Sequence, residues 1–134
     1  MRKVADCPFV LHALEFHRDA NIILSQNNPL LPPRTERVEC MVTEVCNSDL
    51  FDLIAERGPI LDRKLLRAMF KQICIAVDAT KQIGYAHLDI KLENILIGSD
   101  FKLRLCDFGF SRKIGIPLTG IYGSERYMAP EIID

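Results

Sequence analysis

Three short clusters of polar residues in the second half of the chain have side chains that could do chemistry. Residues 87–94 read HLDIKLEN, residues 107–109 read DFG and residues 129–131 read APE. The first two clusters hold carboxylates, a lysine and an amide. A single Asp or Lys in a loop is usually only a solvated charge. The functional interpretation therefore depends on the order and spacing of the clusters, not on one residue.

In that order and spacing, the clusters resemble the catalytic loop, the magnesium-binding loop and the end of the activation segment of protein kinases. About eleven identities, Gly123 included, match the family pattern. At about one in twenty per position, a chance match is on the order of 10^-14. The resemblance covers roughly residues 9–134 and is strongest after Val38.

The resemblance implies a role for each polar residue. Phosphoryl transfer passes through a loose transition state, so positioning and charge neutralisation supply most of the catalysis. Asp89 matches the catalytic base, and Lys91 would offset charge developing on the transferred phosphate. Asn94 and Asp107 match the magnesium ligands, since a hard cation favours carboxylate and amide oxygens. The implied cofactors are ATP and Mg²⁺.

A nucleotide site is implied by the same resemblance. The segment Glu44-Val45-Cys46 resembles the hinge, whose backbone would hydrogen-bond adenine. Asp49 would then contact the ribose, and Leu96 would lie under the adenine ring. A plain strand followed by a turn is an equal alternative for this stretch.

Lys91 also indicates the substrate class. A lysine two residues after the catalytic Asp is typical of serine/threonine kinases, and the pattern from Gly123 to Glu131 agrees with it. Phe110, the bulky residue after DFG, resembles kinases that favour serine as acceptor. The expected partner is a protein with Ser or Thr acceptors. The oligomeric state does not follow from the sequence.

The elements that must position these residues can be predicted from periodicity and from capping residues. Asp62 can cap a long helix that ends near Gly84, and Gly58-Pro59 can end a shorter helix after Asn47-Ser48-Asp49. In chain order we expect a helix end in 4–16, a strand at 22–24, a loop at 27–34, a strand at 38–45, a turn at 47–49, helices at 50–57 and 62–83, and a hairpin at 95–105.

Composition limits the kinds of partner and the cellular compartment that can be expected. The 134 residues carry a net charge of -1, which argues against a nucleic-acid or membrane-surface partner. Five scattered cysteines with no CxxC pair favour reduced thiols in an intracellular protein, cytoplasmic or nuclear. We expect Met41, Met69 and Met128 to pack in the core, and Cys106 to behave as a small buried hydrophobe.

Together these features predict an α+β, partial two-lobed protein-kinase-like fold: the end of the N-lobe, the hinge, and the C-lobe through the activation segment. Residues 1–46 would be the remnant of the N-lobe with the hinge, and residues 47–134 the start of the C-lobe. The expected function is serine/threonine protein kinase.

Two departures from the family pattern leave an alternative open. Leu88 replaces the arginine of the usual HRD motif, and neither a glycine-rich loop nor a VAIK-like lysine is seen upstream of the hinge. We therefore expect an incomplete domain that is inactive alone. The alternative is a non-catalytic, pseudokinase-like module that binds nucleotide or protein.

Overall fold

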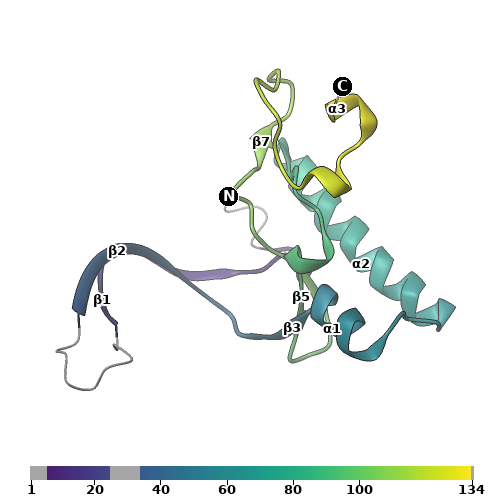
Figure 1. The fold of residues 1–134 in the computed structure, drawn as a ribbon, viewed down its shortest axis with the longest axis horizontal. Helices are drawn as coiled ribbons and strands as arrows, with labels where there is room; N and C mark the ends of the chain where they lie inside the picture. The colour runs from purple at the N-terminus through teal and green to yellow at the C-terminus, as the bar shows by residue number, and fades with distance from the viewer. Residues whose placement is uncertain (1–5, 25–33, 134) are drawn as a thin grey trace. The chain divides into compact units, whose positions relative to one another are not determined.

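The computed structural model describes residues 6–24 and 34–133, which form two compact units (Figure 1). Residues 12–44 belong to the smaller unit, and the segments before and after it form the larger one. The loop predicted at 27–34 lies outside the described residues, apart from Arg34. Residues 6–11 group with the larger unit, so the predicted lobe boundary at residue 46 stays a prediction.

The smaller unit is an antiparallel pair of strands, β1 (Ala13–Leu24) and β2 (Arg34–Thr43). Both strands were predicted, with other limits: β1 begins well before the predicted strand at 22–24, and β2 both begins and ends earlier than the predicted strand at 38–45. Along β2, half-buried Val38 and Cys40 alternate with exposed neighbours, as a strand period of two requires. Core packing of Met41 is a wrong prediction, since its side chain is 59% exposed. Among the described residues of this unit, no second layer of structure covers the sheet formed by β1 and β2.

The helix end predicted for residues 4–16 is also wrong for the described part, residues 6–16. Pro8 lacks the backbone N–H that a helix interior needs. Beyond it, Val10 bridges Leu105 in parallel, and the Leu11 N–H donates to the carbonyl of Leu105 (2.9 Å). Pairing with the edge of a distant strand thus outweighs the local helical pattern.

In the larger unit, the central sheet has three antiparallel strands in the order β3 (Cys46–Asp49), β5 (Ile95–Gly98) and β6 (Leu103–Leu105). The predicted hairpin at 95–105 is confirmed. The predicted turn at 47–49 is instead a strand, because Ser48 pairs with Ile97 and Asp49 with Leu96.

Helix α1 (Leu50–Arg57) begins and ends where the capping residues predict. The Asp49 carboxylate accepts from the Asp52 N–H (2.8 Å), which satisfies one of the unpaired amides of the first turn. Gly58 ends the helix with φ 79°, and its N–H donates to the carbonyl of Ile54.

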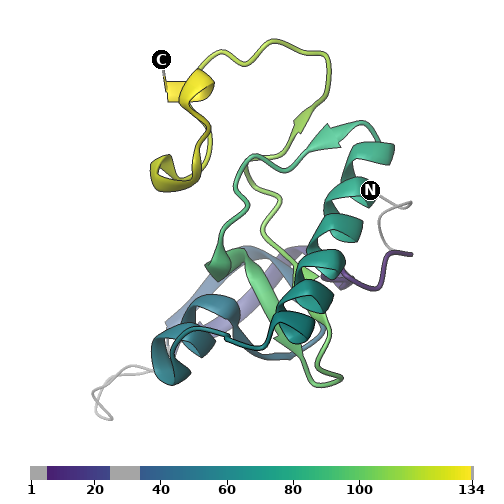
Figure 2. The ribbon, with the colours of Figure 1, turned by 90° about the vertical axis from the view of Figure 1, so that its right-hand side faces the viewer.

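Helix α2 (Arg63–Gln82) also has the predicted limits, with Asp62 as its N-cap. One face lies against the hairpin, where the Leu103 N–H donates to Oε1 of Gln72 at 2.9 Å (Figure 2). Met69 on this face is buried as predicted, whereas Leu66 and Phe70, which follow the same period, are exposed. The buried face of α2 is therefore narrower than the row of apolar residues along its sequence.

The remaining elements are short and support the loops between them. They are β4 (Tyr85–Ala86), the 3₁₀ turn η1 (Leu92–Asn94), β7 (Arg112–Lys113), the 3₁₀ turn η2 (Glu125–Tyr127) and α3 (Pro130–Ile133). Helices and antiparallel sheets together confirm the α+β class. Among the described residues, no helix combines the length and apolar character needed to cross a membrane.

The cap of α2 is testable. Replacing Asp62 with Ala should lower the free energy of unfolding by about 1 kcal/mol, because the carboxylate accepts from the N–H groups of Lys64 (2.7 Å) and Leu65 (3.2 Å). Asp62→Asn keeps a hydrogen-bond acceptor and should lower the free energy of unfolding by at most about 0.3 kcal/mol. Urea unfolding followed by circular dichroism measures both. Equal losses in the two variants would show that the charge, not the cap, matters.

Candidate active site

Asp89 is the centre of the best-organised polar cluster. It lies between β4 and η1, and only 3% of its surface is exposed. Its Oδ2 is 3.1 Å from Nζ of Lys91 and accepts from Nδ2 of Asn94 at 3.0 Å. The same Nδ2 donates to the carbonyl of Asp89 (2.8 Å). Among the described residues no group hydrogen-bonds Oδ1, although this atom is buried. One carboxylate oxygen of Asp89 is therefore without a hydrogen-bond donor in the described part of the chain.

Asp89 and Lys91 each stabilise the charged form of the other. Burial alone would raise the pKa of Asp89, but the nearby Ser124 hydroxyl, the hydrogen bonds from Lys91 and Asn94, and the charge of Lys91 hold it below its ordinary value. Conversely, the hydrogen bond to Asp89 raises the pKa of Lys91. Near neutral pH the carboxylate is therefore ionised and the lysine protonated.

His87 fixes the backbone around Asp89. Its Nε2 donates to the carbonyl of Cys106 (2.9 Å), and its Nδ1 accepts from the N–H of Asp89 (3.2 Å). These two partners require the neutral ring with its proton on Nε2. Burial lowers the pKa of His87, which agrees with that state. Phe108 packs edge-on against the ring, with 4.7 Å between centroids. His87 therefore orients the loop and holds the DFG segment beside it.

Asn94 and Asp107 are brought close through the backbone. The Cys106 N–H donates to the carbonyl of Asn94 (3.0 Å), which continues the β5–β6 ladder to the residue before Asp107. Asp107 has φ 56°, its side chain is exposed, and its Oδ1 accepts from the Gly109 N–H (3.2 Å). Cys106 is half-buried, not fully buried as predicted, and burial raises the pKa of its thiol to about 11, which disfavours the reactive thiolate.

The donor set of these two residues fits a magnesium ion. Both supply oxygens, and Mg²⁺ commonly takes one or two protein ligands and completes its shell with water and phosphate. In the described chain no group of three or more His, Cys, Asp or Glu side chains could hold a metal by itself. A bound ion would therefore depend on Asn94, Asp107 and oxygens of a ligand.

The residues predicted to bind nucleotide fall in different places. Asp49 and Leu96 are paired neighbours on β3 and β5, but the Asp49 carboxylate already caps α1. Cys46 begins β3 opposite Gly98. Glu44 follows β2 in the other unit, where its Oε1 accepts from the His12 N–H (3.5 Å). A hinge role for Glu44 and Cys46 stays a prediction.

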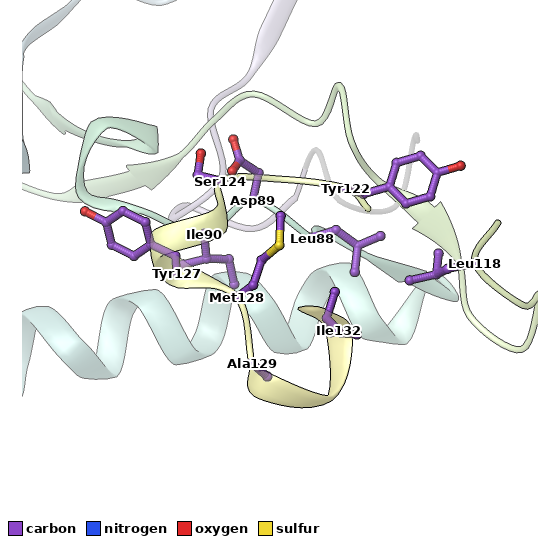
Figure 3. Close-up of a pocket in the computed structure, with 10 residues that line it drawn as sticks. All are labelled: Leu88, Asp89, Ile90, Leu118, Tyr122, Ser124, Tyr127, Met128, Ala129 and Ile132. Carbon is purple, nitrogen blue, oxygen red and sulfur yellow. The ribbon is translucent and has the colours of Figure 1, made fainter. Parts of the chain in front are cut away.

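The activation segment contributes a residue that sequence reasoning did not place in the site. Ser124 Oγ accepts from Nζ of Lys91 at 2.9 Å, so Lys91 joins Asp89 to this segment. Figure 3 shows the side chains of Asp89 and Ser124 next to each other. Gly123, before it, has φ 98°, and a Cβ there would lie 2.1 Å from the carbonyl oxygen of Leu88. The glycine at position 123 was the signal in the sequence for this close contact, because only a residue without a Cβ can lie so near the Leu88 carbonyl.

An apolar cavity of about 210 Å³ lies beside Asp89 (Figure 3). Leu88 lines it together with Leu118, Tyr122, Met128 and Ile132 of the activation segment and α3. Where an HRD arginine would present a charge, this chain therefore presents an aliphatic side chain to aliphatic and aromatic neighbours.

Comparison with known proteins agrees with this geometry. A family model described as "Protein kinase domain" matches residues 2–134. The chain belongs to the protein kinase domain family. Members of this family generally use ATP and Mg²⁺. The partial kinase-like fold predicted from the sequence is consistent with this match.

Curated relatives support the serine/threonine class. NUAK family SNF1-like kinase 2 of Rattus norvegicus is 31% identical over 98% of this chain and 22% of its own length. Serine/threonine-protein kinase TIO of Arabidopsis thaliana is 37% identical over 70% of the chain and 7% of its own length. Maternal embryonic leucine zipper kinase of Danio rerio is 40% identical over 69% of the chain and 14% of its own length. The chain spans less than a quarter of the length of these relatives.

The contact of Gly123 with the catalytic loop gives a prediction. Gly123→Ala should destabilise the chain by at least about 2 kcal/mol more than Gly115→Ala, as measured by urea unfolding. Gly115 is a matched control, because it also has positive φ (85°) but no described atom within 4 Å of the place that an added methyl group would take. Similar losses in both variants would mean that the activation segment moves away from Leu88 at little cost.

His87 predicts a pH dependence. Because its folded pKa is lowered from 6.5, the unfolded chain binds more protons as pH falls below that value. The stability that neutral His87 provides should therefore be lost progressively on acidification from pH 6.5. Unfolding free energies measured across this range should show a smaller slope in His87→Asn. If the dependence of the unfolding free energy on pH were unchanged in His87→Asn, His87 would not be its source.

Proposed function

We propose that this chain carries the catalytic loop of a serine/threonine protein kinase, which transfers the γ-phosphoryl group of ATP to a Ser or Thr hydroxyl of a protein. The observation that supports it most is the carboxylate of Asp89. This group is buried and ionised, it is bonded to Lys91 through Oδ2, and its Oδ1 has no hydrogen-bond partner among the described residues. A substrate hydroxyl is the donor that such an acceptor would orient.

The residues of the site have separable tasks in this mechanism. Asp89 accepts the hydrogen bond of the substrate hydroxyl through Oδ1, and then its proton as the oxygen attacks. Lys91, held between Asp89 and Ser124, supplies positive charge where negative charge develops. Asn94 and Asp107 would hold Mg²⁺, which when bound neutralises charge on the nucleotide phosphates.

The low pKa of Asp89 fits a positioning base. An ionised carboxylate can accept the hydroxyl hydrogen bond throughout the neutral range, and in a loose transition state the proton leaves late, so a strong base is not needed. Serine over threonine preference, suggested by Phe110, belongs to the same proposal. Because the chain covers only part of its relatives' length, the activity proposed is that of the whole protein, and low transfer by the chain alone is expected.

A non-catalytic module that binds nucleotide or protein is the second candidate. Leu88 favours it, because the aliphatic side chain cannot make the charged contact that orders many activation segments. The ordered cluster of Asp89, Lys91 and Asn94 favours catalysis instead, since a binding module does not need all three in this arrangement.

Two substitutions in the full-length protein separate these candidates. Asp89→Asn should reduce phosphate transfer to a mixture of Ser- and Thr-containing peptides by about 10²- to 10⁴-fold and leave magnesium-dependent ATP binding intact. Asp107→Asn should weaken that binding, as measured by calorimetry with and without Mg²⁺. Asp78→Asn, an exposed carboxylate on α2, is the matched control and should change neither quantity.

The contradicting outcomes differ for the two candidates. Magnesium-dependent ATP binding without measurable transfer by the unsubstituted full-length protein would support the non-catalytic module. Transfer that persists undiminished in Asp89→Asn would show that this carboxylate is not the base.

A further inference from the structure

Tyr122 of the activation segment contacts a cation that lies outside the catalytic cluster. The guanidinium carbon of Arg112, on β7, lies 4.4 Å from the centre of the Tyr122 ring. A cation placed over an aromatic ring at this range is attracted by the negative face of the ring. Figure 3 shows the Tyr122 side chain directed away from Asp89, so this contact is separate from the hydrogen bonds of that carboxylate.

Arg112 is itself attached to both loops that carry the proposed chemistry. Strand β7 pairs with β4, where Arg112 lies opposite Ala86, the residue before His87. Its Nη1 donates to the carbonyl of Ser111 (2.9 Å) and, more weakly, to that of Gly109 (3.5 Å) at the end of the DFG segment. Because the guanidinium is held in this way, a ring that stacks on it is fixed relative to both loops.

The charge of Arg112 is available to the ring. Among the described residues, the guanidinium contacts the two carbonyls and Tyr122, and none of these partners is a carboxylate. The Thr119 hydroxyl and Arg112 lower the pKa of the Tyr122 phenol, as hydrogen-bond donors and a nearby cation do. Tyr122 is also half-buried, and an electrostatic contact is stronger where water is partly excluded.

Tyr122 directly precedes the residues that join the activation segment to the catalytic loop. Gly123 lies against the carbonyl oxygen of Leu88, and Ser124 Oγ accepts from Nζ of Lys91 at 2.9 Å. These residues are contiguous in the backbone, so a displacement of Tyr122 would move Gly123 and Ser124 with it. The position of the Tyr122 ring therefore bears on the hydrogen bond that fixes Lys91 from the side of the activation segment.

Leu88 brings no charge to the cavity that Tyr122 lines. The two residues share its wall with Leu118, Met128 and Ile132. An arginine in place of Leu88 would need an anion, such as a phosphorylated side chain, to pair with its charge. The contacts described for this segment are instead apolar packing, a hydrogen bond to a neutral hydroxyl and a cation over a ring, and none of them needs an added phosphate.

We propose that Tyr122 and Arg112 form a positioning pair, which holds the activation segment on the catalytic loop without phosphorylation of that segment. The pair keeps Ser124 at Lys91, and Lys91 in turn stays beside Asp89. The effect of the pair on phosphate transfer rests on the proposed function. Its effect on the segment itself does not, and is measured separately by hydrogen exchange.

The test uses the full-length protein and measures hydrogen–deuterium exchange of the backbone amides of residues 114–128 by mass spectrometry. Tyr122→Leu keeps an apolar side chain in the cavity but removes the aromatic face, and Arg112→Gln removes the charge but keeps a hydrogen-bond donor. Each should speed exchange in this segment, and reduce phosphate transfer, by about three- to tenfold, with ATP binding unchanged. Tyr122→Phe retains the aromatic face and should behave as the original protein; a loss as large as that of Tyr122→Leu would overturn the proposal.

A double variant distinguishes a pair from two separate structural residues. Because Tyr122→Leu and Arg112→Gln remove the same contact, the two changes together should speed exchange no more than either one alone. Effects that multiply would show that the residues act independently, and would overturn the pair. Lys113→Gln is the matched control, since it removes the exposed cation next to Arg112 on β7 and should change neither exchange nor transfer. A loss equal to that of Arg112→Gln would assign the effect to general charge and contradict the proposal.

Phosphatase treatment tests the second half of the proposal. After a phosphatase has removed all phosphate from Ser, Thr and Tyr side chains of the full-length protein, exchange of residues 114–128 and phosphate transfer should each stay within about twofold of their earlier values. Faster exchange together with lost transfer would show that a phosphate positions the segment, and would overturn the proposal. Absence of transfer in the untreated protein would contradict the proposed function instead, while the exchange rates of the Tyr122 and Arg112 variants would still decide whether the pair exists.

Discussion

The buried carboxylate of Asp89 is the constraint around which the catalytic loop is built. A charge removed from water is costly unless it is paired and hydrogen-bonded. Lys91 and Asn94 supply that compensation at Oδ2, and His87 holds the backbone amide of the same residue. Lys91 and His87 are themselves fixed from a second direction, and Lys91 donates to Ser124 Oγ. His87 donates to the Cys106 carbonyl, so the loop before β5 is joined to the loop after β6.

The hairpin and α2 carry this arrangement. Since β5 and β6 pair directly, Asn94 and Cys106 lie opposite each other at the open end of the hairpin, and both chemistry-bearing loops leave from the same edge. α2 packs against the other side of β6 through Met69 and Gln72. A rigid base of this kind lets irregular loops hold a fixed geometry.

Backbone strain in this chain is found where the loops turn. The described non-glycine residues with positive φ are Leu88, Phe101 and Asp107. Leu88 and Asp107 each belong to a cluster with proposed chemistry, and Phe101 lies in the turn of the β5–β6 hairpin. Such conformations persist only when the surrounding structure enforces them, and they concentrate at functional positions.

The sequence by itself determined the elements whose signals are local. Asp49, Gly58 and Asp62 fixed the ends of two helices because capping satisfies amides and carbonyls within one turn. The spacing of residues 87–94 and 107–109 identified the family, since the motifs are contiguous.

Only the tertiary structure decided what depends on distant partners. Residues 9–11 became strand-like because Leu105 offers them a free ladder edge, and residues 47–49 became β3 because β5 pairs with them. The contact of Ser124 with Lys91, across 33 positions, likewise follows from how the loops fold together, as does the absence of a donor to Asp89 Oδ1 among the described residues. Hydrogen bonds between residues far apart in sequence leave no periodic pattern, so the sequence could name the residues of the site but not their contacts.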